Sequence, residues 1–467
     1  NGSFTQESRR FRETNMDLLI SATREVGDFG FDLTVGGNKM YRRADQNNVF
    51  VQDFVVRGLY TVANGRVKDP IYNLSERAVN SVYGSADVSF KRFFFLNGTL
   101  RNDWFSTLSA ANRSILYPSV SGSFVFSDAF SVPSWLSFGK LRLAYAEVGS
   151  DTDVGPYANN LFYGVNANLF PNPAGAAQPI GGASGNVLPN ANLKPMRTSE
   201  KEAGLELKLF QNRVSLDFAV YQKFTEDQIV SAQISDGSGF TNTLINSGKS
   251  RTNGFEGLLN LVPIKKGSFQ WDLSFNGSYN KTKVLKLLTE TEGERITVGT
   301  HVFNGELRQV VGQEMGQIYG FGFRRDAQGN KVFGGNGIPL RTADLISFGS
   351  ALPTWNGGIN NALTFNDFSF SFLIDFKLGN QMLSGTNFNL TRHGLHKQTL
   401  AGRAGIVGVG VNERGEPNTV KANIQPYWEV VRSLALIEPV VYNGGYWKLR
   451  QITASYDLTK FITTNFP

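Results

Sequence analysis

The chain has 467 residues, no cysteine and a net charge of +7. The lack of cysteine excludes disulfides, thiolate metal sites and cysteine nucleophiles, and the lack of any run of about 18 or more apolar residues excludes a transmembrane helix. The charge is dispersed without a basic block, which argues against nucleic acid as a partner. The 50 glycines and 37 phenylalanines, set in alternating patterns, favour an all-β chain.

Segments in which apolar and polar residues alternate recur along the chain. In chain order they include residues 29–35, 120–126, 141–145, 203–209, 214–220, 269–279 and 368–378. The even positions of the last segment are all apolar: Phe368, Phe370, Phe372, Ile374, Phe376 and Leu378. Alternation with a period of two predicts strands that have one apolar face and one polar face.

Two of these segments are long enough to cross a membrane as strands. Residues 269–279 and 368–378 each cover eleven positions, and a tilted membrane strand needs about 9–11 residues, whereas strands of soluble sheets typically have about 5–6. The apolar face suits hydrocarbon, and the polar face suits a water-filled or plugged lumen. We therefore predict an all-β fold, a transmembrane antiparallel up-and-down β-barrel.

The predicted connections alternate between short and long. Tight or short turns are expected at 25–28, 91–92, 210–213, 263–268 and 366–367. Long connections are expected at 102–117, 148–200, 222–252, 280–354 and 379–446. Outer-membrane barrels have short periplasmic turns and longer extracellular loops, so we predict one partial barrel domain over 1–467 with these five extracellular loops. The pattern does not divide residues 38–81 into strands.

About thirteen strands can be recognised. An open sheet of this size would leave unpaired backbone groups in lipid, each costing several kcal/mol, so we expect strands beyond those that the pattern shows. Within 446–456 the apolar parity changes between Leu449 and Ile452. This change predicts a β-bulge near Arg450 and Gln451.

The histidines and one serine–lysine pair are candidate chemical sites. His393 and His396 lie three residues apart, but no third metal ligand is near them. Ser137 and Lys140 fit the pattern S-x-x-K without the motifs that accompany it in enzymes. We find no set of nucleophile, base and orienting group, and we predict that the protein is not an enzyme and has no catalytic residues.

Two loop patterns resemble sites for an ion and for a phosphate group, but both are incomplete. Residues 151–155 resemble the start of a calcium loop but lack its later ligands. Gly408 and Gly410 lack the strand and helix of a phosphate site. We therefore predict no metal-binding or cofactor-binding residues.

Substrate contacts are expected on the long connections, because aromatic side chains there can stack on sugars or peptides. Residues 160–170 carry Phe162 and Tyr163. We favour the interpretation that these two rings pack the loop against its neighbours, and no substrate-binding residue is predicted.

A series of motifs resembles one family. They are SVYGSADVSFKRFFFLNGTLRND at 81–103, YPSVSGSFVFSDAF at 117–130, GKLRLAYAEVGSD at 139–151, the stretch from LPNANLKPM to TEDQIV at 188–230, NSGKSRTNGFEG at 246–257 and GGYWKLRQITASYDL at 444–458. Together they resemble the barrel of SusC/RagA-type TonB-dependent outer-membrane transporters. Met196 and Ser85 depart from the family pattern without affecting the fold.

The resemblance implies a barrel of about 22 strands with a plugged lumen in the outer membrane of a Gram-negative bacterium. It implies import of an oligosaccharide or a peptide, with TonB and a SusD-like lipoprotein as partners and a possible dimer of transporter–lid pairs. The chain starts with NGSFTQES, without a secretion signal. By this resemblance, the TonB box, the plug, the first strands and the closing strands are expected outside these 467 residues.

Within the motif at 246–257, the family-like residues are Asn246, Gly248, Asn253, Gly254 and Glu256. We expect them to shape the passage from a loop into a strand, because Asn and Gly supply turn geometry. A ligand role for Glu256 is the minority alternative.

Three other functions stay open at this stage. A siderophore-type TonB-dependent receptor and a passive porin would both lack a lid lipoprotein. A secreted, soluble β-rich adhesin would need no membrane. The solvent that meets the apolar strand face separates the adhesin from the other candidates.

Overall fold

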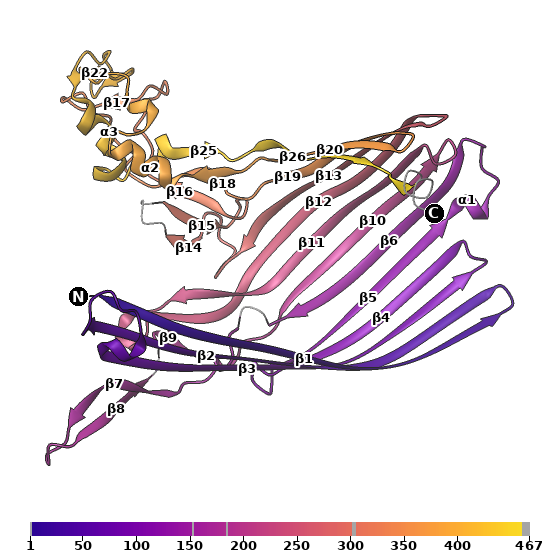
Figure 1. The fold of residues 1–467 in the computed structure, drawn as a ribbon, viewed down its shortest axis with the longest axis horizontal. Coiled ribbons are helices and arrows are strands. Elements are labelled where there is room, and N and C mark those ends of the chain that lie inside the picture. The colour runs from indigo at the N-terminus through magenta and orange to yellow at the C-terminus, as the bar shows by residue number, and fades with distance from the viewer. Residues whose placement is uncertain (1, 152–153, 184, 301–304, 460–467) are drawn as a thin grey trace. The chain divides into compact units, whose positions relative to one another are not determined.

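The computed structural model describes residues 2–151, 154–183, 185–300 and 305–459. Its largest element is a 14-stranded sheet in which thirteen strands follow one another in chain order and β9 pairs with β12 (Figure 1). These strands are β1 (Ser3–Val26), β2 (Phe29–Phe54), β3 (Gly65–Phe90), β4 (Phe94–Phe105), β5 (Ser114–Val125), β6 (Leu136–Ser150), β9 (Val187–Leu188), β10 (Met196–Leu209), β11 (Val214–Gln233), β12 (Asn242–Lys266), β13 (Phe269–Lys286), β19 (Trp355–Phe365), β20 (Phe368–Leu378) and β26 (Tyr446–Tyr456). The predicted all-β class is confirmed.

The chain forms two compact units. The first comprises residues 1–125, 142–201 and 225–248, and the second comprises 126–141, 202–224 and 249–467. Pairing is antiparallel from β1 to β5 in the first unit. In the second unit it is antiparallel from β12 through β13, β19 and β20 to β26.

The smaller elements lie in the connections between these strands. The short strands are β7 (Tyr163–Pro171), β8 (Ala177–Ala183), β14 (Arg295–Thr300), β15 (Glu306–Val310), β16 (Gln317–Gly320), β17 (Val332–Phe333), β18 (Ile346–Ser350), β21 (Gln381–Leu383), β22 (Ile406–Val407), β23 (Val411–Asn412), β24 (Lys421–Ala422) and β25 (Val441–Asn443). The helices are α1 (Phe126–Ala129), α2 (Gly385–Arg392) and α3 (Ile424–Ser433), with 3₁₀ turns η1 (Val62–Asn64), η2 (Asp236–Ser238), η3 (Lys397–Thr399) and η4 (Glu438–Val440). Among the described residues, none of these helices has the length and apolar character to cross a membrane.

The alternation in the sequence becomes a continuous apolar face in the second unit. Trp271, Leu273 and Phe275 of β13 lie opposite Leu363, Asn361 and Ile359 of β19. The same three residues lie opposite Ile264, Leu261 and Leu259 of β12. Asn361 is a polar residue within this face, and its Oδ1 accepts a hydrogen bond of 2.8 Å from Trp271 Nε1. The pairing satisfies both groups, so the face can meet an apolar solvent.

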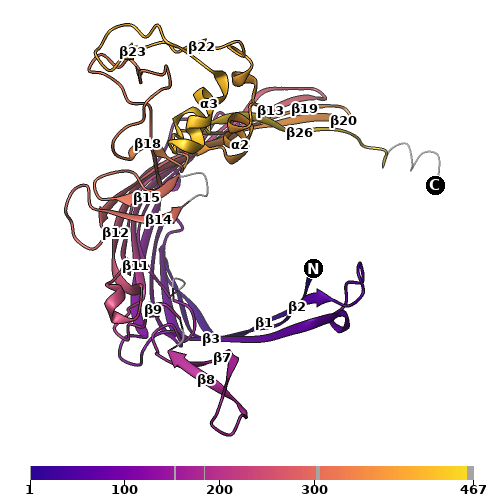
Figure 2. The same ribbon diagram turned by 90° about the vertical axis from the view of Figure 1, so that its left-hand side faces the viewer.

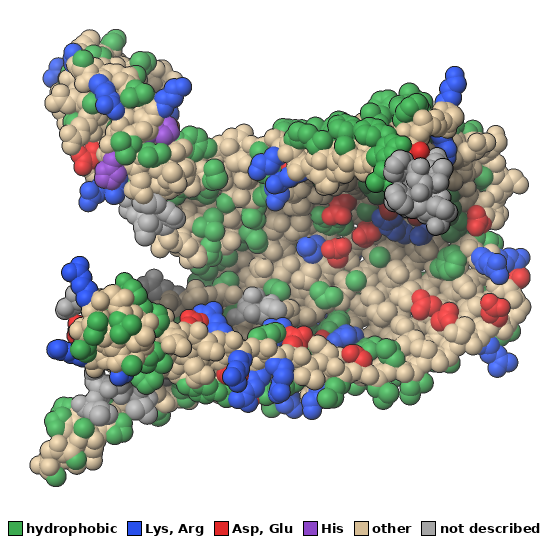
Figure 3. Space-filling model, viewed as in Figure 1, with side chains coloured by type: hydrophobic (Ala, Val, Ile, Leu, Met, Phe, Trp, Pro, Cys, Tyr) green, Lys and Arg blue, Asp and Glu red, His purple; other side chains and the backbone are tan. Residues whose placement is uncertain are grey.

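Large apolar side chains on the strands remain exposed. In the second unit, Ile452 of β26 is 61% exposed and Phe365 of β19 is 55% exposed. Hydrophobic side chains gather along β13, β19, β20 and β26 (Figure 3). Contiguous apolar surface on this scale is unusual on a soluble protein, and it is what strands that face hydrocarbon present.

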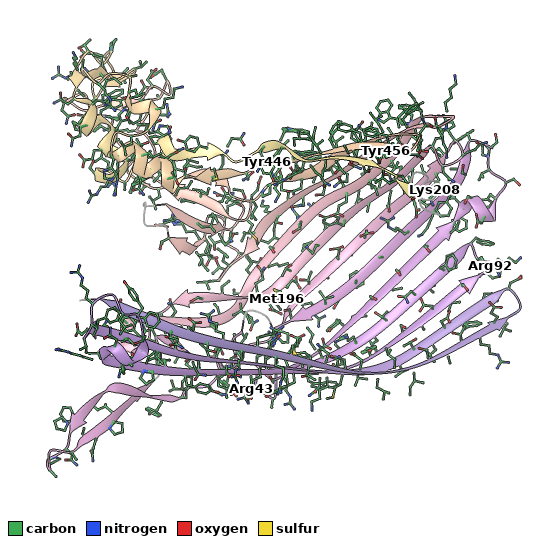
Figure 4. The ribbon with its side chains drawn as sticks, in the orientation of Figure 1. Arg43, Arg92, Met196, Lys208, Tyr446 and Tyr456 are labelled. Carbon is green, nitrogen blue, oxygen red and sulfur yellow. The ribbon has the colours of Figure 1, made fainter. Side chains whose placement is uncertain are left out.

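Several local expectations are confirmed. β20 covers 368–378, as predicted, and two-residue turns connect β1 to β2 at 27–28 and β19 to β20 at 366–367. In β26, whose ends are marked by Tyr446 and Tyr456 in Figure 4, Leu373 pairs with Gln451 but Ile374 pairs with Leu449. Arg450 is therefore the extra residue of the predicted bulge, which lets Trp447 and Ile452 share one face although their parity differs.

The strands run further than the apolar alternation indicates. β11 and β12 extend the sheet across most of 222–252 and leave 234–241 as the connection, and 102–117 shrinks to 106–113. Residues 38–81, which the pattern left undivided, form the end of β2, the turn η1 and the start of β3. Backbone pairing continues beyond the apolar zone because the hydrogen-bond ladder does not depend on which side chains alternate.

Candidate functional site

Two long connections carry folded structure of their own. Residues 151–195, between β6 and β10, contain the β7–β8 hairpin and β9. Residues 287–354 contain the four-stranded sheet β14–β15–β16–β18, and residues 379–445 contain the helices α2 and α3. The two helices lie beside each other (Figure 2). We call residues 287–354 and 379–445 together the loop module. Binding residues are commonly found on loops that a rigid scaffold holds, so these connections are the candidate functional regions.

The connection 151–195 is fastened by a buried ion pair at its start. The side chain of Asp151 is 0% exposed, and its carboxylate accepts hydrogen bonds from Arg77 of β3 and from the Thr107 hydroxyl. Burial raises the pKa of the Asp151 carboxyl above its ordinary value, while the bonds from Thr107 and Arg77 act in the opposite direction. A buried carboxylate needs such partners, so the position of the chain after β6 is strongly specified.

Apolar contacts fasten the same connection at both ends. Val154 near its start and Leu193 near its end join a buried cluster with Val79, Phe105, Leu108, Ile115 and Tyr117. Asn246 adds polar contacts, because its Oδ1 accepts from the Lys194 amide and its Nδ2 donates to the carbonyls of Lys194 and Asp227, all at 2.8 Å. Asn246 and the other motif residues, Gly248, Asn253, Gly254 and Glu256, lie inside β12, which begins at Asn242. The expectation that they shape the passage from a loop into a strand is therefore wrong, and Asn246 instead ties β12 to the end of the connection.

The loop module has its own apolar core. Phe388 of α2, Val431 of α3, Ile437, Val440 and Ile318 form a buried cluster. Glu438 supports it, since its carboxylate accepts 2.7 Å bonds from the Phe323 amide and from Arg325 Nη2. Burial lowers the pKa of Lys331, whose Nζ lies 3.9 Å from the centre of the Phe323 ring. The module is therefore packed like a small soluble domain and can hold surface residues in fixed positions.

A pocket of about 400 Å³ opens in the loop module. Its lining comes from the end of α2, the segment 394–403 and the start of α3, and includes Thr391, Arg392, His393, Arg403, Gln425 and Trp428. The volume falls within the range of small-molecule sites, about 300–1,000 Å³. Sequence reasoning did not single out Arg392, Arg403, Gln425 or Trp428, because their spacing follows no motif.

The two histidines considered as a metal pair have other roles. His396 Nδ1 accepts a 3.2 Å bond from the Gln398 amide and caps η3, and His393 Nε2 accepts a 2.9 Å bond from Arg392 Nε. In the part of the chain that the structure describes, no group of three His, Cys, Asp or Glu residues could hold a metal ion.

The other patterns also have structural roles. Ser137 Oγ accepts a bond from the Gln211 amide, and Lys140 lies 3.7 Å from Glu206. Within 151–155, Asp151 forms the buried ion pair with Arg77, and residues 152–153 lie outside the described residues.

Gly408 and Gly410 lie in close contact with the segment around Phe333. A Cβ at Gly408 would clash with the Phe333 ring, and a Cβ at Gly410 would clash with the Lys331 carbonyl, so both glycines permit close packing. Phe162 and Tyr163 are 54% and 79% exposed. Their exposure contradicts the favoured interpretation that they pack the loop, since a ring held between neighbours would be covered.

The antiparallel sheet, its exposed apolar face and its folded connections define a transmembrane β-barrel protein. The family model described as "TonB dependent receptor-like, beta-barrel" matches residues 1–466, so the chain belongs to this family of outer-membrane proteins of Gram-negative bacteria. The family is a class of receptors and transporters and not of enzymes.

Individual relatives agree with this assignment. The TonB-dependent receptor P3 of Formosa agariphila is 24% identical over an alignment of 493 residues. The alignment covers 98% of this chain and 46% of that protein. The TonB-dependent receptor SusC of Bacteroides thetaiotaomicron is 23% identical over 396 residues, covering 81% of this chain and 38% of that protein. The chain thus spans less than half the length of these curated relatives.

A solved structure shows the same fold. The RagAB peptide transporter superposes with a TM-score of 0.77 at 17% sequence identity, over 98% of this chain and 51% of that chain. Together with SusC, this match confirms the resemblance to SusC/RagA-type proteins that the motifs indicated.

Proposed function

We propose that this chain forms part of the barrel of an importer. The importer carries a large nutrient, an oligosaccharide or a peptide, across the outer membrane. TonB supplies the energy, and a SusD-like lipoprotein covers the surface opening. The observation that carries the proposal is the family match over residues 1–466. The similarity to SusC and to the RagAB fold supports it.

The two kinds of connection support an orientation in the membrane. The tight turns at 27–28, 267–268 and 366–367 contrast with the folded connections 151–195 and the loop module. Because outer-membrane barrels place short turns in the periplasm and long loops outside, we assign the folded connections to the cell surface. There they meet the nutrient and the lipoprotein.

Co-purification tests the lidded importer. The protein is tagged in its own cell, the outer membrane is solubilised in mild detergent, and the purified material is identified by mass spectrometry and sized. A stoichiometric SusD-like lipoprotein supports the proposal, and a size of two transporter–lid pairs supports the dimer. A barrel recovered alone favours a siderophore-type receptor or a porin, and recovery in the soluble fraction favours the adhesin.

Uptake in cells with and without TonB separates the remaining functions. The importer and a siderophore-type receptor both need TonB, whereas a porin passes its solute by diffusion. Equal uptake in the two strains contradicts the proposal.

A further inference from the structure

The pocket of the loop module is rich in hydrogen-bond donors. Arg392 and Arg403 line it, and neither guanidinium forms an ion pair with an acidic side chain among the described residues. Arg392 uses Nε on His393, and Arg403 uses Nη2 on the Gly394 carbonyl at 3.0 Å. A guanidinium has five N–H donors, so both side chains keep donors for a further partner.

Trp428 adds a second, independent observation. This residue lines the pocket, and its Nε1 is buried without a hydrogen-bond partner in the part of the chain that the structure describes. A buried N–H that lacks a hydrogen-bond partner destabilises the folded state. Each unpartnered buried group in a folded protein calls for an explanation, and this one belongs to a residue of the pocket lining.

A purely structural role accounts for only part of this arrangement. Arg392 stands in the last turn of α2, where a cation is favoured by the helix dipole. That role explains one arginine at a helix end, and Arg432 at the end of α3 offers the same interaction without lining the pocket. It does not explain Arg403, which lies outside both helices, or the unpartnered indole N–H of Trp428.

The donors select an anionic ligand. Arginine binds carboxylate and sulfate in a planar, bidentate geometry. The wall also offers an indole and polar side chains, and Ile424 is the one aliphatic side chain among the described lining residues. An acidic peptide could also present a carboxylate to these arginines. The polar walls beside an aromatic ring favour a hydroxyl-rich sugar over a peptide with apolar side chains.

We infer that this pocket binds an oligosaccharide whose residues carry an oxyanion, a carboxylate or a sulfate, as the nutrient of the importer. The inference rests on the proposed function for its physiological meaning, but binding itself does not depend on TonB or on a lid. Arg392 and Arg403 hold the oxyanion, and the indole of Trp428 lies beside the sugar.

Binding to the intact detergent-purified protein tests the inference. The acidic probes are trimers of galacturonate and of mannuronate and a sulfated chondroitin oligosaccharide, and the neutral probes are maltotriose and cellotriose. A tripeptide with a free carboxylate represents the competing class. At least one acidic sugar is expected to bind about tenfold or more tightly than every neutral sugar and the peptide, and its affinity is expected to fall with added salt.

Matched variants locate the site. Arg392→Gln and Arg403→Gln are each expected to weaken the acidic sugar about tenfold or more, since a charge-assisted bond is lost, and Trp428→Phe is expected to weaken it severalfold. Arg432→Gln removes the same charge from the same kind of helix end and is expected to stay within about twofold of the parent.

The opposite results are equally clear. The inference is overturned if no acidic sugar binds, if neutral sugars bind equally well, or if the peptide is preferred. It is also overturned if Arg392→Gln and Arg432→Gln have equal effects. Co-purification and TonB-dependent uptake are measured separately from binding to the pocket. A protein that imports its nutrient without binding acidic sugars contradicts this inference only, and a protein that binds them without TonB-dependent uptake contradicts the proposed function only.

Discussion

The strands β13, β19, β20 and β26 and the loop module use apolar residues in opposite ways. On the strands, large side chains such as Ile452 and Phe365 are exposed along one face. In the loop module, Phe388 is 1% exposed and packs with Val431 against its neighbours. The same residue types therefore serve two solvents, hydrocarbon for the sheet and the protein interior for the module.

The difference shows what holds each region together. The sheet is specified by backbone pairing, and its apolar face fits lipid without forming an enclosed core. The module depends on complementary packing and on buried polar anchors such as Glu438. Changes that leave a void should therefore act strongly in the module, and changes that introduce charge should act strongly on the strands.

The largest effect is expected from Phe388→Ala. Removing a fully buried ring leaves a cavity and should cost about 3–5 kcal/mol. Hydrogen exchange of the loop module in the detergent-purified protein measures the loss. Phe372→Ala on β20 should cost less, because lipid or detergent chains fill the space that the ring leaves. Equal costs for the two changes would contradict the proposed difference in solvent.

Loss of the partner of a buried charge in the first unit should be nearly as destabilising as the loss of the Phe388 ring. Arg77→Met removes the partner of fully buried Asp151 and should cost about 3–5 kcal/mol in the attachment of residues 151–195. Hydrogen exchange of 154–183, compared with the parent at each pH, measures the change. The double variant Arg77→Met with Asp151→Asn should recover most of the loss.

The pH dependence of this variant follows from the sign of the shift. Burial raises the pKa of Asp151 above its ordinary value of 3.8, and removal of Arg77 raises it further. The folded state then binds the proton more tightly than the unfolded state. The stability that this proton provides is fully present below the ordinary pKa and is lost as pH rises through the folded pKa. Damage in Arg77→Met that is independent of pH would count against the buried ion pair.

A charge on the apolar strand face gives the next effect. Phe372→Arg should cost about 2–4 kcal/mol near the membrane midplane. Ser371→Arg, one residue away on the polar face, should be nearly silent. Urea unfolding of the protein in lipid bilayers compares the two. If both arginines have the same effect, the assignment of the even positions of β20 to lipid is wrong.

The smallest effect concerns the polar pair within the apolar face. Asn361→Ala leaves Trp271 Nε1 without its 2.8 Å partner and should cost about 0.6 kcal/mol, with about 2 kcal/mol as the upper range for such bonds in membranes. Asn360→Ala, on the opposite face of β19, is the matched control. The same unfolding assay resolves the difference, and a control as damaging as Asn361→Ala would show that the bond has no role.

The sequence predicted the features that depend on local periodicity. Alternation in 368–378 defined β20, and the change of parity after Leu449 located the bulge at Arg450. It underestimated the strands around 222–252, where polar residues continue to pair after the apolar face has ended. Strand pairing is a backbone property, whereas the pattern reports the solvent that each side chain meets.

By itself, the sequence determined the class of fold, the positions of the tight turns, the apolar face and the family, because each of these repeats along the chain or rests on neighbouring residues. The tertiary structure alone decided the buried pair of Arg77 and Asp151 and the pocket that joins Arg392, Arg403 and Trp428. Arg77 and Asp151 are far apart in the sequence, and Arg392, Arg403 and Trp428 come from three separate segments that share no period. They meet because packing around buried cores brings separate segments together, and no local pattern encodes that packing.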